Sequence, residues 1–258
     1  MSEALLKIQN LKKAFGGLLA IVDFSVLVEA GQIKSVIGPN GAGKTTLFNL
    51  ITGVHPVSAG KIFFQGKDIT RLRPHQIAAR GISRTFQTIE LFGNMNVLEN
   101  VMVGCHTRFR SGMLASGLRL PNMRRDETRI YQNSIKLLQM AGLASKAEMP
   151  ATSLPLGEQK TLEILRALAS EPRLLLLDEP AAGLNESETD RMSELIYAIR
   201  DQGITILLVE HDMRLVMKIS DEIAVVNYGQ KIAEGHPEVV QNDPQVIEAY
   251  LGGDIEYA

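Results

Sequence analysis

The sequence reads Gly38-Pro39-Asn40-Gly41-Ala42-Gly43-Lys44-Thr45-Thr46 between an apolar strand pattern, Ile33 to Ile37, and a helical pattern, Leu47 to Thr52. A glycine-rich turn between a strand and a helix lets backbone N–H groups and the positive helix end converge on an anion. The pattern predicts a phosphate-binding P-loop. We expect Lys44 to reach the β- and γ-phosphates, Thr45 to bind Mg²⁺ through its hydroxyl, and Thr46 to contact the α-phosphate.

A second motif, Leu174-Leu175-Leu176-Leu177-Asp178-Glu179-Pro180, joins four leucines to two acids. Four successive leucines suit a strand buried on both faces, which presents the acids at its C-terminal edge. Such acids cost free energy unless a metal or a reaction uses them. We expect Asp178 to hold Mg²⁺, directly or through water, and Glu179 to orient and deprotonate the attacking water. The two motifs together predict a site for ATP and Mg²⁺.

Further motifs give the chain a resemblance to the ATP-binding subunits of ABC transporters over nearly its whole length. They are Gln87, Leu154 to Gln159, Ala182 to Asn185 and His211. The resemblance implies an α/β P-loop NTPase fold of ABC type, with a parallel core sheet and an antiparallel β subdomain. Residues 1–258 would form one nucleotide-binding domain, with the nucleotide-binding lobe at 1–87 and 166–258. Residues 88–165 lack a strand pattern and are interpreted as an inserted helical subdomain.

The resemblance also implies roles for single residues. Phe15 would stack on adenine, although a phenylalanine before a strand also suits the core. Gln87 would bind Mg²⁺ and the attacking water through its amide. His211 follows the apolar strand pattern Ile204 to Val209 and would contact the γ-phosphate, and the alternative is a solvated loop histidine. Glu179, His211 and Gln87 are therefore the predicted catalytic residues.

One motif departs from the family pattern. The family reads Leu-Ser-Gly-Gly-Gln where this chain has Leu154-Pro155-Leu156-Gly157-Glu158-Gln159. Gly157 and Glu158 would face the ATP of a partner subunit, but Pro155 removes a hydroxyl and a backbone N–H from that face. The lost contacts favour pairing with a different ATPase chain. Asn185 would cross the dimer interface, and it also suits the N-cap of the helix that follows.

Composition excludes several other classes of protein. The 258 residues carry a formal net charge of −2, which argues against a general nucleic-acid-binding surface. Cys105 is the single cysteine, so an intramolecular disulfide is impossible and a reducing compartment fits. The five histidines are scattered without metal-ligand spacing. No apolar run approaches the roughly 20 residues that span a bilayer, and the N-terminus lacks a secretory pattern.

Within the family, the chain looks most like the ATPases of importers for branched-chain amino acids and similar solutes. The residues that carry this likeness are Arg84-Thr85-Phe86-Gln87, Ala181-Ala182-Gly183-Leu184-Asn185, Val209-Glu210-His211-Asp212-Met213 and Ile247-Glu248-Ala249-Tyr250-Leu251-Gly252. Two alternatives are an ATPase of the lipopolysaccharide-export type and a soluble ABC ATPase outside transport. The single P-loop and the lack of a long coiled coil count against the latter.

The likeness implies a peripheral ATPase at the cytoplasmic face of the inner or plasma membrane. Its partners would be a second ATPase subunit, transmembrane permease subunits and, indirectly, a periplasmic or extracellular solute-binding protein. Glu90-Leu91-Phe92 would meet a permease, or Leu91 and Phe92 would belong to the core. The arginine-rich stretch from Arg108 to Arg129 is expected to be a solvated loop, or else a contact with lipid headgroups or a permease. The solute is chosen by other chains, and the sequence leaves open whether the chain pairs with itself.

Overall fold

The computed structural model describes residues 4–105 and 121–251. Among these residues the strands form one ten-stranded sheet in the order β5-β4-β1-β2-β10-β9-β3-β8-β7-β6. The strands are β1 (Ala4–Phe15), β2 (Leu18–Glu29), β3 (Ile33–Ile37), β4 (Ala59–Phe64), β5 (Lys67–Asp68), β6 (Ile82–Arg84), β7 (Leu174–Asp178), β8 (Thr205–Val209), β9 (Glu222–Asn227) and β10 (Gln230–Gly235). The sheet has an antiparallel part, where β1 pairs with β2 and β4, and a parallel part formed by β9, β3, β8, β7 and β6.

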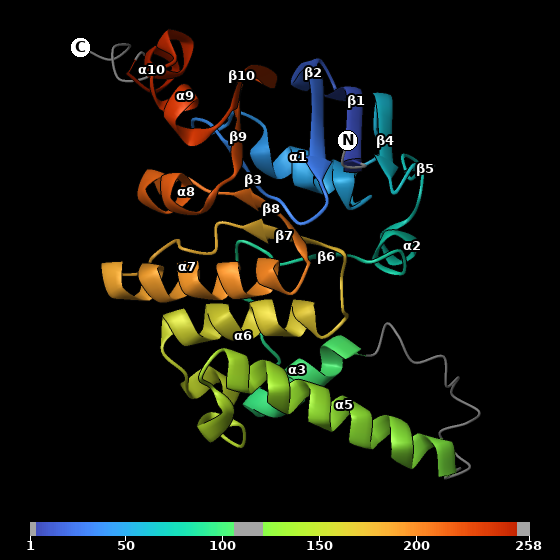
Figure 1. Cartoon of the computed structure of the whole chain (residues 1–258). Coiled ribbons are helices and arrows are strands. Elements are labelled where there is room, and N and C mark those ends of the chain that lie inside the picture. The colour runs from blue at the N-terminus through green and yellow to red at the C-terminus, as the bar shows by residue number, and fades with distance from the viewer. Residues whose placement is uncertain (1–3, 106–120, 252–258) are drawn as a thin grey trace.

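The parallel part is the centre of the molecule because helices cover both of its faces. Strands β3, β7 and β8 are buried at every position. Successive side chains of a strand point to opposite faces, so Leu174 and Leu176 enter one hydrophobic cluster with α1 (Lys44–Ile51). Leu175 and Leu177 enter the other cluster, with the helices below the sheet in Figure 1. The leucine run therefore builds both cores at once.

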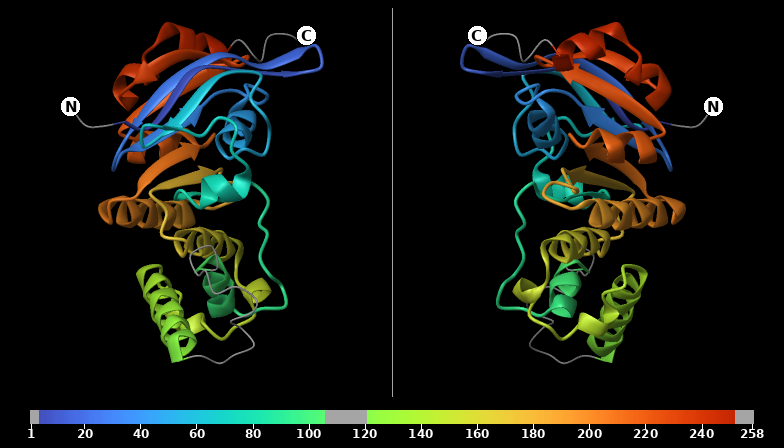
Figure 2. Two further views of the ribbon diagram at one scale, coloured as in Figure 1. Left: turned by 90° about the vertical axis from the view of Figure 1, so that its right-hand side faces the viewer. Right: turned by 90° about the vertical axis from the view of Figure 1, so that its left-hand side faces the viewer.

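The remaining helices complete the layers around the sheet. They are α2 (Pro74–Ala78), α3 (Val97–Gly104), α5 (Pro121–Met140), α6 (Leu156–Leu168), α7 (Glu186–Asp201), α8 (Met213–Ile219), α9 (Pro237–Gln241) and α10 (Pro244–Leu251). Helix α3 packs against α5 and α6, and Figure 2 shows α3 and α5 at the end of the molecule farthest from the antiparallel strands. Because α6 crosses the predicted boundary at residue 165, the subdomain division stays a prediction.

Most predicted elements are present, with two differences in extent. The strand Ile33–Ile37 lies where the sequence predicted it, and β8 falls on the predicted strand pattern Ile204 to Val209. Helix α1 begins three positions before the predicted start, at Lys44. Helix α5 begins at Pro121, so residues 121–129 of the expected arginine-rich loop are helical, while 106–120 lie outside the described residues. Arginine and glutamate are good helix formers, and proline is tolerated in a first helical turn.

The parallel register decides where the functional loops emerge. Val36 of β3 pairs with Val209 of β8, and Asp178 of β7 also pairs with Val209. Arg84, the last residue of β6, pairs with Leu176. The segments that follow these four strands therefore start at the same carboxyl edge of the sheet, which is where open α/β sheets hold their ligands.

Candidate nucleotide-binding site

The P-loop joins β3 to α1, and its backbone requires glycine at several positions. Gly41 and Gly43 have φ angles of 79° and 108°, in the region that other residues rarely adopt. A Cβ at Gly43 would lie 2.7 Å from the Ala20 carbonyl oxygen, and one at Gly38 would lie 2.0 Å from the Val226 carbonyl oxygen. The loop therefore lies tightly against neighbouring backbone segments. The N–H groups at its junction with α1 are placed to bind an anion.

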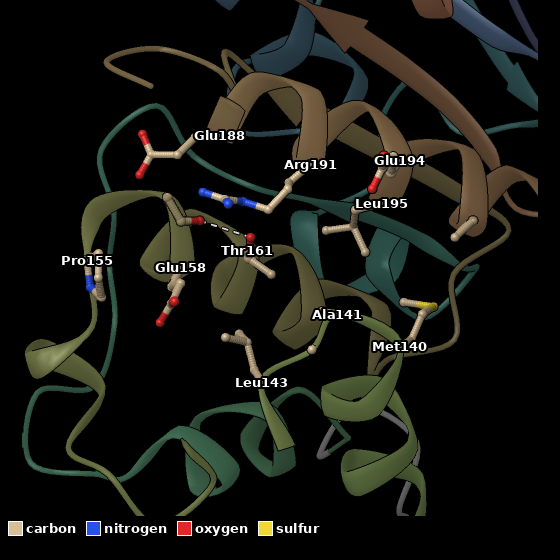
Figure 3. Close-up of a pocket in the computed structure, with 13 residues that line it drawn as sticks. Met140, Ala141, Leu143, Pro155, Glu158, Thr161, Glu188, Arg191, Glu194 and Leu195 are labelled. Atoms are coloured by element: carbon tan, nitrogen blue, oxygen red, sulfur yellow. Dashed lines mark hydrogen bonds between the residues drawn. The ribbon is translucent and has the colours of Figure 1, made fainter. Parts of the chain in front are cut away.

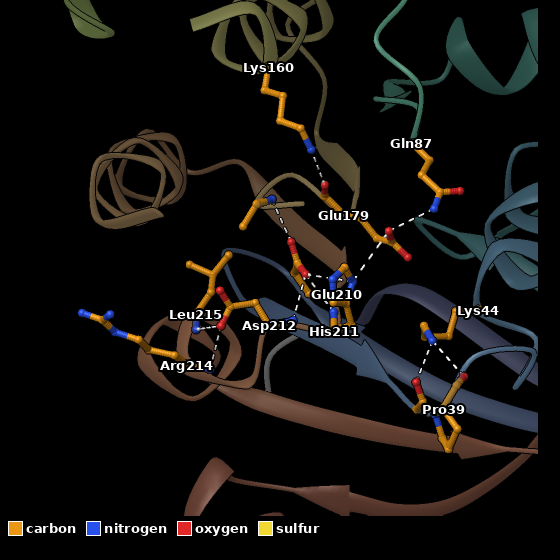
Figure 4. Close-up of polar contacts among 12 residues, drawn as sticks. Pro39, Lys44, Gln87, Lys160, Glu179, Glu210, His211, Asp212, Arg214 and Leu215 are labelled. Carbon is orange, nitrogen blue, oxygen red and sulfur yellow. Dashed lines mark hydrogen bonds and ion pairs between the residues drawn. The ribbon is translucent and has the colours of Figure 1, made fainter. Parts of the chain in front are cut away.

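Lys44 lies inside the P-loop and is almost fully buried. Its ammonium donates to the carbonyl oxygens of Gly38 at 2.6 Å and Pro39 at 3.0 Å, as Figure 4 shows. Burial lowers the pKa of Lys44, while the nearby carboxylates of Glu179 and Asp178 oppose that shift. Thr45, the next residue, is exposed at the start of α1. The P-loop thus carries the ammonium of Lys44 at its centre and the exposed hydroxyl of Thr45 at its edge.

Asp178 ends β7 with its side chain buried. Its Oδ2 accepts a hydrogen bond from Arg84 at 2.8 Å, and its Oδ1 has no hydrogen-bond partner within the described part of the chain. Burial raises the pKa of this carboxyl, and the hydrogen bond and charge of Arg84 act in the opposite direction. One carboxylate oxygen is therefore free to bind a cation or a water bound to it.

Glu179 turns away from the strand into the site. Its φ is 50°, which lies in the left-handed region, and its N–H still donates to the Val209 carbonyl at 2.8 Å. The Glu179 carboxylate accepts from the Gln87 amide at 3.0 Å, and His211 Nδ1 lies 3.6 Å from the same oxygen. The three residues predicted to be catalytic, which come from three different loops, are thus brought together around one carboxylate (Figure 4).

Phe15 is less clearly placed for the role predicted from the resemblance. Its ring is 42% exposed and meets the His55 ring edge to face, with centroids 5.3 Å apart. The Lys13 ammonium lies 4.6 Å from the centroid of the Phe15 ring. Phe15 is therefore not a core residue, so the alternative role does not hold. Its stacking on adenine stays a prediction.

The signature segment Leu154 to Gln159 lies away from the P-loop of its own chain, because α6 and α1 cover opposite faces of the sheet. Pro155 is the N-cap of α6 and offers no side-chain hydrogen bond to the first turn. Gly157 faces α7, since a Cβ there would lie 3.1 Å from Glu188 Oε1. Glu158 instead forms an ion pair with Lys146 at 2.6 Å. Neither Gly157 nor Glu158 can serve the P-loop of this chain.

A cavity of about 630 Å³ opens beside this segment. Pro155, Gly157 and Glu158 line it from α6, and Glu188 and Arg191 line it from α7, as Figure 3 shows. Asn185 caps α7 by accepting from Glu188 N–H at 3.0 Å, so its alternative reading as a helix cap is confirmed. The start of α7 and the signature segment therefore form one surface.

Four polar residues support the site without having a role predicted from the sequence. They are Arg84, Lys160, Glu163 and Glu210. Lys160 donates to the Glu179 carbonyl at 2.9 Å, and Glu163 accepts from the Phe86 N–H at 3.2 Å. Glu210 is fully buried and accepts from the N–H groups of Ala181, His211 and Asp212. A sequence signal was available for Glu163, which lies between Leu162 and Ile164, and for Glu210, which follows the apolar strand, since charged residues are seldom buried without a partner.

Comparison with known proteins decides the family. A family model described as ABC transporter matches residues 21–182. The chain belongs to the ABC transporter ATP-binding family. A second family model, described as branched-chain amino acid ATP-binding cassette transporter, matches residues 230–256. The predicted family and α/β fold class are thereby confirmed.

Curated relatives and solved structures of this ABC family cover nearly the whole chain. BraF of Pseudomonas aeruginosa and LivG of Escherichia coli, both high-affinity branched-chain amino acid transport ATP-binding proteins, are each 44% identical over 98% of this chain and 99% of their own length. The ADP conformation of MJ1267, an ATP-binding cassette of an ABC transporter, is 32% identical with a TM-score of 0.85 and covers 97% of this chain and 100% of its own. A nucleotide-free cassette covers 96% of this chain and 99% of its own, at 32% identity and a TM-score of 0.83.

The chain is therefore an ATPase subunit of an ABC transporter: it binds nucleotide and hydrolyses ATP to power transport. A further solved structure, cbiO1 from Clostridium perfringens, is 26% identical with a TM-score of 0.80 over 98% of this chain and 96% of its own, and is described as part of an ABC transporter complex. The two alternatives, lipopolysaccharide export and an ABC ATPase outside transport, gain no support from these relatives. Within the described residues, no helix is both long and apolar enough to span a membrane.

Proposed function

We propose that this chain powers an importer for branched-chain amino acids or similar small solutes. The observation that carries the proposal is the 44% identity, over almost the full length of both chains, to BraF and LivG, whose names state that transport. The match of residues 230–256 to the branched-chain family model supports it independently of the ATPase motifs. The solute itself would be selected by the other chains of the transporter.

In this proposal the P-loop holds the phosphates of ATP, with Lys44 at the β- and γ-phosphates and Phe15 against the adenine. Thr45, Gln87 and Asp178 would hold Mg²⁺, whose preferred ligands are oxygens. The buried Asp178 Oδ1, which has no hydrogen-bond partner among residues 4–105 and 121–251, and the exposed Thr45 suit such a cation. When bound, Mg²⁺ neutralises negative charge on the β- and γ-phosphates.

Glu179 would act as the general base by accepting a proton from the attacking water on its carboxylate. A carboxylate does this only if it is held toward the water, and Gln87 and His211 contact the Glu179 carboxylate in the structure. His211 would in addition donate a hydrogen bond to the γ-phosphate. Glu210, by accepting from the His211 N–H, fixes the backbone from which that imidazole extends.

Hydrolysis would need two ATPase subunits that enclose two nucleotides. Gly157 and Glu158 would contact the ATP bound to the P-loop of the partner subunit, because they lie across the sheet from their own P-loop. Pro155 offers no hydroxyl to that ATP, and hydrogen bonds to charged groups contribute about 1.5–3 kcal/mol each. The weaker composite site favours a second, related ATPase chain as the partner, and the assembly would sit at the cytoplasmic face of the membrane on its permeases.

Co-purification tests this proposal. A tagged copy of the chain is expressed in its own cell, extracted in mild detergent, and its companions are identified by mass spectrometry. We expect two polytopic permeases and a second, related ATPase. In proteoliposomes that contain this complex, ATP hydrolysis should rise when the binding protein is loaded with leucine and stay basal with the unloaded protein. Recovery of the chain only with itself, or a rate that ignores leucine and its analogues, would contradict the importer.

A further inference from the structure

Arg84 is the last residue of β6 and stands three positions before Gln87. Its side chain is only 6% exposed. One terminal nitrogen of the guanidinium donates to Asp178 Oδ2 at 2.8 Å, and the other donates to Asn49 Oδ1 at 2.7 Å. Asn49 belongs to α1, the helix that follows the P-loop. The planar fork of Arg84 therefore ties the acid of β7 to the helix of the P-loop.

Two aromatic rings lie beside this guanidinium. The Arg84 Cζ atom lies 5.4 Å from the centroid of the Phe48 ring and 5.2 Å from that of Phe86. Phe86 precedes Gln87, and its N–H donates to Glu163 of α6. These ring contacts and the hydrogen bonds at both terminal nitrogens restrict the rotation of the guanidinium, while its buried Nε has no hydrogen-bond partner among the described residues. Its position is thus set by α1 on one side and by the segment that carries Gln87 on the other.

The charges around Asp178 show what this arrangement leaves available. Arg84 covers Oδ2 but not Oδ1, which is buried without a partner among the described residues. The neighbouring cation, Lys44, donates to the carbonyl oxygens of Gly38 and Pro39. A buried carboxylate oxygen without a partner is costly, so a ligand at Oδ1 would relieve a real deficit.

We propose that Arg84 is a positioning residue for the metal site: anchored on Asn49, it holds the Asp178 carboxylate with Oδ1 turned to Mg²⁺. Through its contact with the Phe86 ring, the same guanidinium also fixes where the segment that carries Gln87 lies relative to Asp178. The inference rests on the proposed role of Asp178 in binding Mg²⁺. A merely structural ion pair would support the fold equally with and without the metal, and the test uses that difference.

The test measures binding rather than turnover. The full chain with Glu179→Gln is titrated with a fluorescent ATP analogue, N-methylanthraniloyl-ATP, first in EDTA and then at rising Mg²⁺ concentration. The Mg²⁺ concentration that gives half of the metal-dependent gain in affinity is the readout. Lysine keeps the charge of Arg84 but cannot donate to Asp178 and Asn49 through one planar fork. For Arg84→Lys we expect this concentration to rise about 10-fold, the usual size of such supporting contacts, with the affinity in EDTA unchanged.

Two further variants sharpen the result. Asn49→Ala keeps the Arg84–Asp178 pair and removes the shorter of the two hydrogen bonds to α1 and its C-cap, leaving the one to Thr52 Oγ1 at 3.4 Å, so the half-maximal Mg²⁺ concentration should rise by a smaller factor. Arg80→Lys is the matched control, because Arg80 is an exposed arginine near the same strand whose guanidinium donates only to the Gln76 carbonyl among the described residues. It should leave both readings unchanged.

The outcomes separate the inference from the proposed function. If the chain with native Arg84 gains no affinity from Mg²⁺, or Asp178→Asn keeps the full gain, the metal site itself is wrong. If that gain exists and Arg84→Lys matches the Arg80→Lys control, Arg84 does not position Asp178. A loss of affinity that is equal in EDTA and in Mg²⁺ also overturns the inference, because it marks a structural role. Should Arg84→Lys fail to fold, Asn49→Ala decides alone.

Discussion

Glu179 shows how much of the site depends on single residues. Its backbone is in the left-handed region, its carbonyl accepts from Lys160 and its carboxylate accepts from Gln87. A non-glycine residue with this φ costs free energy unless its surroundings fix it. Here the neighbours fix it by hydrogen bonds at both the main chain and the side chain. The carboxylate is thereby directed at the loops that follow β6 and β8.

Replacing Glu179 with glutamine removes the base while keeping the shape of the side chain. Because general-base catalysis contributes about 10²–10⁴-fold, we expect Glu179→Gln to lower ATP hydrolysis by at least about 100-fold with ATP binding retained. The measurement is the hydrolysis rate of the assembled complex, together with ATP affinity. Glu238→Gln, on the exposed face of α9, is the control and should behave like wild type. Hydrolysis near the wild-type rate would refute the assignment of Glu179.

At the scale of the element, α6 connects regions that the sequence places far apart. Pro155 and Gly157 stand at its N-terminus, Lys160 donates to the Glu179 carbonyl, and Glu163 accepts from Phe86 one residue before Gln87. A movement of α6 would therefore displace the main chain of Glu179 and of Phe86 at the nucleotide-binding site. Helix α6 thus links the surface for the partner nucleotide to the site of its own.

The N-terminus of α6 can be improved by one substitution. Pro155 adopts φ −57° and ψ 157°, angles that a serine N-cap also adopts, but it supplies no side-chain acceptor. A serine cap stabilises a helix by about 0.5–2 kcal/mol relative to a residue without one. We therefore expect Pro155→Ser to raise the melting temperature and to raise the ATPase rate of the complex. Pro237→Ser, at the start of α9, is the matched control for a helix-start proline. A higher melting temperature with no change in rate would show that Gly157 suffices.

Glu163, on α6, makes the stability of the folded protein depend on pH. Burial raises the pKa of its carboxyl above 4.5, so the folded state binds a proton before the unfolded chain does. Between the raised pKa and 4.5, the folded state therefore binds more protons than the unfolded chain, so the free energy of unfolding increases as the pH falls. Below 4.5 both states are protonated, and this contribution is constant. Wild type should gain stability relative to Glu163→Gln as the pH falls through that window. Melting temperatures of both proteins across the pH range test this, and a constant difference would contradict it.

At the scale of the whole molecule, the antiparallel strands must be joined to the parallel core. The register between β10 and β2 rests on one residue pair, Gln230 with Asp23. Lys34 of β3 strengthens this junction from within. Its ammonium, buried to 1% exposure, contacts Glu222 of β9 and Glu234 of β10 and donates to the Leu27 carbonyl of β2. One cation thereby holds four strands together.

Removing that cation should loosen the junction. Lys34→Met leaves Glu222 and Glu234 facing each other without their shared partner, yet both carboxylates are partly exposed. We therefore expect the free energy of unfolding to fall by about 2 kcal/mol, below the cost of breaking a fully buried pair. Urea denaturation measures it, with Lys7→Met on the exposed face of β1 as the control. Equal midpoints for the two variants would show that Lys34 does not join the halves of the sheet.

Much of the fold was readable from the sequence because local patterns are physical constraints. The glycine spacing at 38–46, the leucine run into Asp178 and the apolar strand before His211 each predicted a strand with a polar loop at its end. Their extents were less predictable. Helix α5 begins at Pro121, a proline that suits a first helical position, and the arginines that follow it are helix formers, although the stretch also suits a solvated loop by composition.

The sequence by itself determined the family, the P-loop and the identity of the residues expected at the phosphates. Only the tertiary structure brought Gln87, Glu179 and His211 to one point and revealed Arg84, Lys160 and Glu163 as their supports. A motif can be recognised in the sequence when residues that are neighbours along the chain act together, as the glycines of a turn do. The role of the buried Arg84 depends on its partners Asn49 and Asp178. These lie 35 and 94 positions away in the sequence and meet Arg84 only when β6, β7 and α1 pack together.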